Sequence, residues 1–287
     1  MSCYIRTVDV STGAISEAPY EADSLAEAIS REAAGGVYAA FATWYGGKVV
    51  RLTHHLERLV DSARRVGIDL VLDRTATVGA LGSMLERSGY GEAKIRISVA
   101  PPNSEDQAIR LVTVAMEQFA GPPKEAKESG VRCSLLKQIR RDDPRAKRTD
   151  WLKTRASFAP ADGVAEQLLV REDGAILEGA SSNFYAIDAG AILYTAEEGI
   201  LFGTSRAIVL EIAPRIVQVK LEPPQAAMLP RYAECFLSSA SRGIIPIVTI
   251  DETAVGDGTP GPLTRELMNA YDALAKMMAE PLLPPVA

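Results

Sequence analysis

The chain is poor in residues that several common chemistries require. It contains only two histidines, His54 and His55, and they are adjacent, so zinc-hydrolase chemistry and histidine-based triads have little support. Its three cysteines, Cys3, Cys133 and Cys235, are odd in number and widely spaced. This pattern matches neither a metal motif nor a disulfide framework, and it favours a reducing, intracellular setting.

Long apolar runs and a surplus of basic residues are also absent. No stretch approaches the roughly 18 consecutive apolar residues that a membrane-spanning helix needs. The opening residues, MSCYIRTVDVSTG, lack the apolar core of a signal peptide. The net charge of −6 argues against a nucleic-acid-binding surface. We therefore expect a cytoplasmic protein with no membrane partner, no nucleic-acid partner and no bound metal.

The composition suits a sizeable core. The chain has 287 residues, of which 47% are hydrophobic and 24% charged, enough for one large domain or two ordinary ones. Predicted hairpins outnumber strand–helix–strand crossovers, which favours an α+β fold in two domains with mixed or antiparallel sheets. The segment AGPPKEAKESG is rich in Pro, Gly and charge and predicts an exposed linker. The expected division is an N-terminal domain at 1–119, a linker at 120–130 and a C-terminal domain at 131–287.

Two neighbouring segments of the first domain illustrate the patterning. VYAAFATWYGGKVVRL predicts a hairpin that turns at its Gly-Gly pair. THHLERLVDSARRVGI predicts an amphipathic helix that ends at Gly67. The apolar stripe expected on this helix comprises Leu56, Leu59, Val60, Ala63 and Val66.

The stretch from 170 to 206 combines an acid with a helix start. Glu178 follows an apolar run and precedes small polar residues, so it suits a protonated ring nitrogen as well as it suits an ordinary strand end. Gly203, Thr204 and Ser205 open a helix, where free N–H groups and the dipole favour an anion, although a plain N-cap fits the same residues. A ligand with both a phosphate and a protonatable ring would satisfy both features.

Cationic candidates lie upstream. Lys147 follows a proline-marked turn, where its side chain can point into a cleft, and Lys153 lies in the helix that follows. Either could be a surface charge, whereas a Schiff-base lysine must be buried enough to lose its proton. Arg58 shares a helical face with His55 and suits bidentate phosphate binding, although a solvated arginine fits equally. The segment LSSASRG is a second cluster of small hydroxyls after a strand.

The order of these motifs is more specific than any one of them. HxxRL, a lysine, EGxSSN, GTSR and SSAS follow one another from RLTHHLERL to GPLTRELMNAY. In this order they resemble the class IV aminotransferases, pyridoxal-phosphate enzymes that include the D-amino acid and branched-chain aminotransferases and aminodeoxychorismate lyase. The resemblance implies a two-domain D-amino acid aminotransferase-like α+β fold, with the cofactor in the cleft between domains. It also implies a homodimer with small amino acid and keto acid substrates.

The resemblance assigns roles to particular residues. The family's Schiff-base lysine lies about thirty residues before the acid of EGxSSN, and Lys147 lies 31 residues before Glu178, whereas Lys153 is too close. Glu178 matches the acid that pairs with the pyridine nitrogen and keeps it protonated. Arg58 matches the phosphate-binding arginine. The other positions implied to contact the cofactor are Ser182, Asn183, Gly203, Thr204, Ser205, Ala240 and Ser241, with Ser239 as the alternative to Ser241.

Some positions depart from the family pattern. Many members carry threonine where this chain has Ala240, so one phosphate hydroxyl is lost or supplied by a neighbour. The tyrosine that follows the lysine in branched-chain enzymes is absent from the segment Asp150-Trp151-Leu152. Ala39 and Ala40 stand where lyase-type sequences carry Thr-Thr, which counts against a lyase. The substrate contacts implied are Tyr38, Arg96 and Arg242.

The expected activity is amino transfer between an amino acid or amine and a 2-oxo acid. The amine of Lys147, once released by the amino donor, would act as general base. Two alternatives stay open at this stage: an elimination of the aminodeoxychorismate lyase type, and a cofactor-binding protein without turnover.

Overall fold

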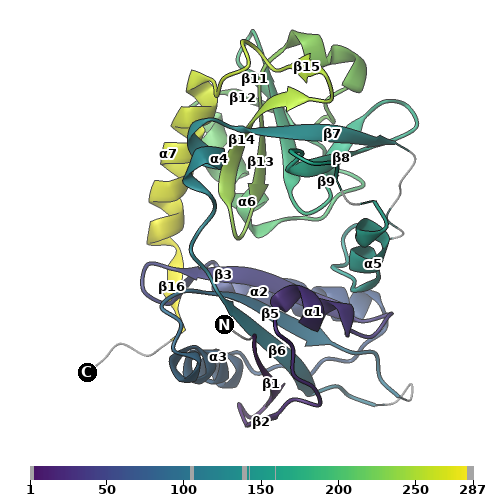
Figure 1. The fold of residues 1–287 in the computed structure, drawn as a ribbon, viewed down its shortest axis with the longest axis vertical. Helices are drawn as coiled ribbons and strands as arrows, with labels where there is room; N and C mark the ends of the chain where they lie inside the picture. Colours follow the sequence, from purple (N-terminus) through teal and green to yellow (C-terminus); the bar gives the residue numbers. More distant parts are fainter. Residues whose placement is uncertain (1–2, 104–106, 138–140, 142, 159, 283–287) are drawn as a thin grey trace. The chain divides into compact units, whose positions relative to one another are not determined.

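A computed structural model describes residues 3–103, 107–137, 141, 143–158 and 160–282 (Figure 1). The chain forms two compact units. The first comprises Met1–Ala120, Ala146–Ser157 and Lys276–Ala287, and the second comprises Gly121–Arg145 and Phe158–Ala275. The segment that carries Lys147 therefore groups with the N-terminal residues. The division into domains at the 120–130 linker stays a prediction.

The first unit is built on an antiparallel sheet. Its order, in the described part of the chain, is β16-β4-β3-β5-β6-β1-β2. The strands are β1 (Tyr4–Asp9), β2 (Ile15–Glu17), β3 (Val37–Trp44), β4 (Lys48–Val50), β5 (Ala93–Val99), β6 (Leu111–Gln118) and β16 (Ala279–Pro281). The helices are α1 (Leu25–Ser30), α2 (Leu52–Arg65), α3 (Arg74–Ser88) and α5 (Asp150–Ala156).

Helix α2 buries a stripe that differs from the expected one. Leu56, Leu59 and Ala63 are buried as expected, but Val60 is 36% exposed. The reason is that His55 and Ser62 are buried too. At 3.6 residues per turn these two polar side chains lie on the flank opposite Val60, so the buried face is centred farther from it.

The second unit is a mixed sheet, as the sequence predicted. Its order is β12-β11-β10-β13-β14-β7-β8-β9, and an additional pairing of β9 with β10 closes β10, β13, β14, β7, β8 and β9 into a ring. The pairs β14–β7, β7–β8 and β11–β12 are parallel. The strands are β7 (Val131–Lys137), β8 (Glu166–Val170), β9 (Ile176–Gly179), β10 (Asn183–Asp188), β11 (Ile192–Tyr194), β12 (Gln218–Lys220), β13 (Tyr232–Ser239), β14 (Gly243–Ile250) and β15 (Thr253–Ala254). The helices are α4 (Lys124–Glu128), α6 (Thr204–Ile212) and α7 (Pro262–Met277), with 3-10 turns η1 (Ala213–Arg215) and η2 (Ala226–Arg231).

The α+β fold class predicted from the sequence is confirmed, and most predicted elements are present. Two local features were missed. The linker contains the short helix α4, and the C-terminal segment Ala279–Pro281 forms β16, which pairs with β4. Neither feature has a strong sequence pattern, because α4 is only five residues long and β16 only three.

Candidate active site

In the first unit, Lys147 is held at its main chain by two elements. The Tyr38 N–H on β3 donates to the Lys147 carbonyl at 2.9 Å. The Lys147 N–H donates to Ser62 Oγ on α2 at 3.2 Å. Arg148, the next residue, pairs with Val37 in an isolated antiparallel bridge. These contacts place Lys147 beside the start of β3, and its Nζ lies 4.8 Å from the centroid of the Tyr38 ring.

Helix α2 brings Arg58 and His55 to the same region of the first unit. Arg58 Nη2 lies 3.4 Å from His55 Nδ1, as the i, i+3 spacing predicts. His55 is 1% exposed, and its ring lies 4.9 Å from that of Phe41. Burial, together with the nearby Arg58 and Lys147 cations, lowers the pKa of His55 well below its ordinary value of 6.5. His55 is therefore neutral at neutral pH and leaves Arg58 as the cation on this face.

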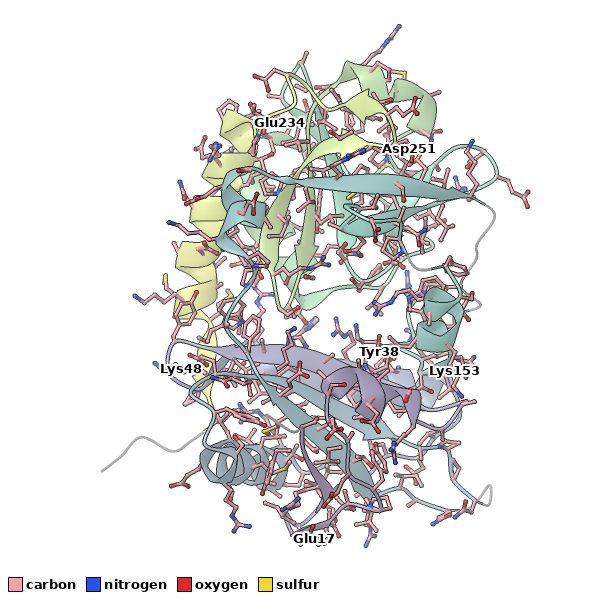
Figure 2. The ribbon with its side chains drawn as sticks, in the orientation of Figure 1. Glu17, Tyr38, Lys48, Lys153, Glu234 and Asp251 are labelled. Carbon is pink, nitrogen blue, oxygen red and sulfur yellow. The ribbon has the colours of Figure 1, made fainter. Side chains whose placement is uncertain are left out.

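Lys153, the alternative lysine, has a different environment. It lies on α5 and is exposed, whereas Tyr38 on β3 is buried (Figure 2). Of the two candidates, Lys147 is the one set among buried side chains.

In the second unit, Glu178 is buried and paired. It lies on β9 with 2% exposure. Arg141 Nη1 donates to its Oε1 at 2.7 Å, and the Leu201 N–H donates to its Oε2 at 3.0 Å. The sequence analysis missed Arg141. The only hint in the sequence was the run Arg140-Arg141 next to an acidic pair. Arg141 and Glu178 are 37 residues apart, and a contact over such a separation leaves no periodic pattern in the sequence.

The residues before α6 are fixed by Asn183. Its Nδ2 donates to the Leu201 carbonyl at 2.9 Å. A Cβ at Gly203 would lie 2.3 Å from Asn183 Oδ1, so any larger residue would displace this amide. Glycine thus allows close packing against Asn183 at the residue that precedes α6.

The first turn of α6 is polar and buried. Thr204 and Ser205 are each 3% exposed, and the Tyr271 hydroxyl donates to Ser205 Oγ at 2.8 Å. Arg206 is 7% exposed, and its Nη2 donates to the Ala196 carbonyl at 2.9 Å. Its Nε has no hydrogen-bond partner within the residues that the structure describes. Burial lowers the pKa of Arg206.

A second buried carboxylate organises the SSN segment. Arg242 Nη2 donates to Glu166 Oε2 at 2.6 Å and to Ser181 Oγ at 3.1 Å. Ser182 Oγ donates to Glu166 Oε1 at 3.0 Å. Burial opposes ionisation of Glu166, but Arg242 and Ser181 outweigh it and hold the pKa of Glu166 below its ordinary value. Glu166 was missed because nothing in EQLLVRED distinguishes it from a strand-end acid.

The remaining predicted residues lie in two places. Ala240 and Ser241 lie in the turn between β13 and β14, and the neighbouring Ser239 Oγ accepts from Arg242 Nε at 3.0 Å. Arg96 on β5 is 3% exposed and paired with Glu32. Arg96 and Arg242 are thus both engaged by carboxylates of this chain, and their substrate contacts stay predictions.

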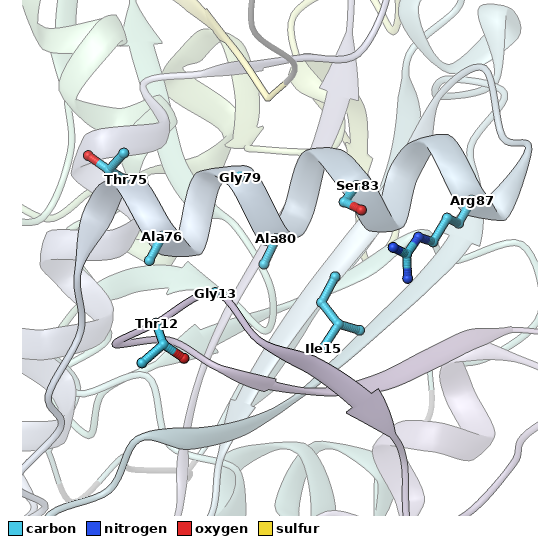
Figure 3. Close-up of a pocket in the computed structure, with 9 residues that line it drawn as sticks. All are labelled: Thr12, Gly13, Ile15, Thr75, Ala76, Gly79, Ala80, Ser83 and Arg87. Carbon is cyan, nitrogen blue, oxygen red and sulfur yellow. The ribbon is translucent and has the colours of Figure 1, made fainter.

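A cavity of about 410 Å³ in the first unit lies away from these residues (Figure 3). Its lining comes from α3 and the turn between β1 and β2, and comprises Thr12, Gly13, Ile15, Thr75, Ala76, Gly79, Ala80, Ser83 and Arg87. None of these is a predicted site residue. Among the described residues, no helix is long and apolar enough to cross a membrane, and no cluster of ligands for a metal ion is found.

Comparison with known proteins identifies the family. The pattern of the family described as Amino-transferase class IV matches residues 39–250. A D-alanine aminotransferase of Staphylococcus haemolyticus is 28% identical over 238 residues, covering 79% of this chain and 84% of that protein. The Arabidopsis thaliana branched-chain-amino-acid aminotransferase-like protein 1 is 25% identical over 257 residues, covering 83% of this chain and 45% of that protein. The chain belongs to the class IV aminotransferases.

Solved structures show the same fold. The T.th. branched-chain amino acid aminotransferase with pyridoxamine 5'-phosphate superposes with a TM-score of 0.79 at 19% identity, covering 98% of each chain. The branched-chain aminotransferase of Thermoproteus uzoniensis with norvaline gives 0.77 at 23%, covering 99% of each chain. The expected aminotransferase-like fold is confirmed. As a class IV enzyme, the protein uses pyridoxal phosphate to transfer an amino group between an amino acid or amine and a 2-oxo acid.

The chain supplies donors of the types that this cofactor needs. A phosphate calls for cations and for N–H or hydroxyl donors, and the first unit has Arg58 on α2 while the second has Thr204 and Ser205 in the first turn of α6. A ring nitrogen calls for a buried carboxylate, and Glu178 is buried in the second unit. An aldehyde calls for an amine, and Lys147 of the first unit carries one. The unpartnered Nε of Arg206, in the first turn of α6, is a further buried donor that an anion would satisfy.

Proposed function

We propose that Lys147 is the residue that binds pyridoxal phosphate covalently, as a Schiff base, and that Lys153 has no part in the reaction. The observation that carries this proposal is the anchoring of Lys147 through its main chain to Tyr38 and Ser62. Because backbone contacts fix the residue, bond formation at its amine would not loosen the segment. Arg58 lies on the same helix as Ser62, one turn earlier.

When bound, pyridoxal phosphate supplies an aldehyde carbon and an electron-withdrawing ring. The amine of Lys147 would act as the general base that takes up and returns the proton of the substrate α-carbon. Tyr38 holds the main chain of Lys147 through the hydrogen bond from its N–H to the Lys147 carbonyl, and its ring centroid lies 4.8 Å from Nζ. Positioning of this kind lowers the barrier because the base no longer has to be oriented during the reaction.

Other residues of the site bind without reacting. Glu178 would accept a hydrogen bond from the protonated ring nitrogen, and Arg141 keeps a positive charge beside this carboxylate. Arg58, Thr204 and Ser205 would bind the phosphate, together with the turn that contains Ala240 and Ser241. Asn183 and Ser182 fix the segments that carry these groups, through Leu201 and Glu166 respectively.

Reductive trapping tests the assignment of the lysine. The protein is loaded with pyridoxal phosphate, reduced with borohydride and digested, and the modified peptide is located by mass spectrometry. We expect the cofactor mass on Lys147 in the wild-type chain and in a Lys153→Ala variant alike. Modification of Lys153 in the wild-type chain would contradict the proposal.

The assembly and location are part of the proposal. A homodimer is supported by the family resemblance, and a cytoplasmic location by three buried cysteines that form no disulfide. Light scattering is expected to give about twice the 30.7 kDa chain mass. A monomer that transfers amino groups at full rate, or recovery of the protein outside the cytoplasmic fraction of its cells, would contradict these two statements.

A further inference from the structure

Arg96 and Glu32 form a buried ion pair in the first unit. The side chains of Arg96 and Glu32 are 3% and 7% exposed. Arg96 donates from Nε to one carboxylate oxygen and from Nη2 to the other at 2.5 Å, which is a bidentate geometry. The Ser98 hydroxyl also donates to Glu32. The positive charge of Arg96 is thus neutralised by a carboxylate of this chain.

This ion pair is adjacent to the proposed reacting amine. In the sheet, Tyr38 of β3 pairs with Ser98, and Ala40 pairs with Arg96. Alternation along the strands puts all four side chains on one face. The small Ala40 opposite Arg96 leaves the guanidinium room to lean diagonally over Tyr38, with Cζ 3.5 Å from the ring centroid.

The Tyr38 ring connects the ion pair to Lys147. Lys147 Nζ lies 4.8 Å from the same ring centroid. The separation of the Arg96 and Lys147 cations therefore cannot exceed the sum of these two short distances. A substrate that reacts at Lys147 therefore comes close to Tyr38 and to the charged groups of Arg96 and Glu32. Whether Arg96 attracts a second negative charge on that substrate depends on Glu32.

We propose that Glu32 is a specificity-determining residue: by neutralising Arg96, it makes the site beside Lys147 accept uncharged substrate side chains and disfavour those with a second carboxylate. Arg96 is then a positioning residue for Tyr38, not an anion acceptor. This inference rests on the proposed role of Lys147. Its physical basis is that a buried cation without a counter-ion attracts an anion, whereas a cation in a bidentate pair with satisfied hydrogen bonds does not.

A charge-only change at residue 32 tests the inference. Glu32→Gln keeps the shape and one acceptor oxygen but leaves Arg96 uncompensated. The matched substrates are glutamate and glutamine, which likewise differ by a carboxylate and an amide of nearly the same shape. We expect the ratio of kcat/KM for glutamate to that for glutamine to rise about tenfold or more over the wild type. An unchanged ratio in a folded variant overturns the proposal.

Two controls separate charge from packing. Ser98→Ala removes a hydrogen bond to Glu32 without changing any charge, and Glu27→Gln removes an acid that pairs with Arg31 on the exposed side of α1. Both variants should keep the wild-type ratio. The double variant Glu32→Gln/Arg96→Gln removes both charges and should return the ratio toward the wild-type value. A ratio that stays raised in the double variant contradicts a role for the Arg96 charge.

A binding measurement on the wild-type holoenzyme keeps the test open if Glu32→Gln fails to fold. Calorimetry compares valerate with glutarate, which has the same carbon chain and a second carboxylate. We expect valerate to bind about tenfold more tightly or better. Equal or tighter binding of glutarate overturns the inference. The role of Lys147 is tested separately by reductive trapping with borohydride. Failure of that experiment would contradict the proposed function, whereas failure of the substrate comparison would contradict only the role of Glu32.

Discussion

Replacing Lys147 with alanine is expected to reduce amino transfer by about four orders of magnitude or more, because in the proposed role one side chain is both covalent anchor and general base. The fold should persist. The contacts that hold this segment, to Tyr38 and Ser62, are made by the Lys147 main chain, which the substitution leaves in place. Stopped-flow measurement of the half-reaction, beside a thermal melt, separates activity from stability.

The matched control is Lys153→Ala, in the same segment but at an exposed helical position. It should retain the wild-type rate within about twofold, since surface substitutions rarely matter. A Lys147→Ala protein that still transfers amino groups at a wild-type rate would refute the assigned role, and so would a large loss in Lys153→Ala alone.

Glu178→Gln is expected to have the second-largest effect, and it should reduce both activity and stability. The amide keeps an acceptor for the Leu201 N–H but loses the negative charge. Without this charge the ring nitrogen is not held protonated, so the half-reaction should slow by about 10²-fold or more. The buried ion pair with Arg141 loses its negative partner, which should lower the free energy of unfolding by about 3–5 kcal/mol.

The double variant Glu178→Gln/Arg141→Met separates these two effects. Removing both charges should restore much of the lost stability, because the cation that lost its carboxylate is removed as well. The half-reaction should remain slow, since the carboxylate is still missing. Denaturant unfolding and single-turnover kinetics on the same samples measure the two quantities. Recovery of the rate together with the stability would mean that Glu178 acts only through Arg141.

The roles assigned to the site residues stay predictions, and the structure shows which of their surroundings the sequence foresaw. Lys147 and Arg58 were identified because their spacing follows a family order, and the structure brings them to the same region of the first unit around His55. Glu178 is buried as its apolar strand predicted. In contrast, the partners Arg141, Glu166 and Glu32 were not foreseen. Each pairs with a residue far away in the chain, and such pairing depends on three-dimensional packing, not on local periodicity.

Two local predictions illustrate the same limit. The stripe on α2 was drawn from apolar residues only, so it included Val60 and missed His55 and Ser62, which are buried because they meet Phe41 and the Lys147 backbone. Gly203 was predicted only as part of an anion-binding helix start, whereas the structure adds a reason within the chain, since a side chain there would collide with Asn183. A neighbour from a distant segment decided both positions.

The first unit is built from three separate segments of the chain, and this limits where related chains can recombine. Ala146–Ser157 and Lys276–Ala287 belong to the unit built mainly from the first 120 residues. A recombination point in the linker would pass Lys147 on with one parent and its anchors, Tyr38 and Ser62, with the other. It would also separate β16 from its partner β4. A chimaera of two relatives joined at this linker should therefore keep Lys147 in place only if the contacts of one parent fit the segment of the other. The two parts of the chain on either side of the linker are thus expected to evolve together.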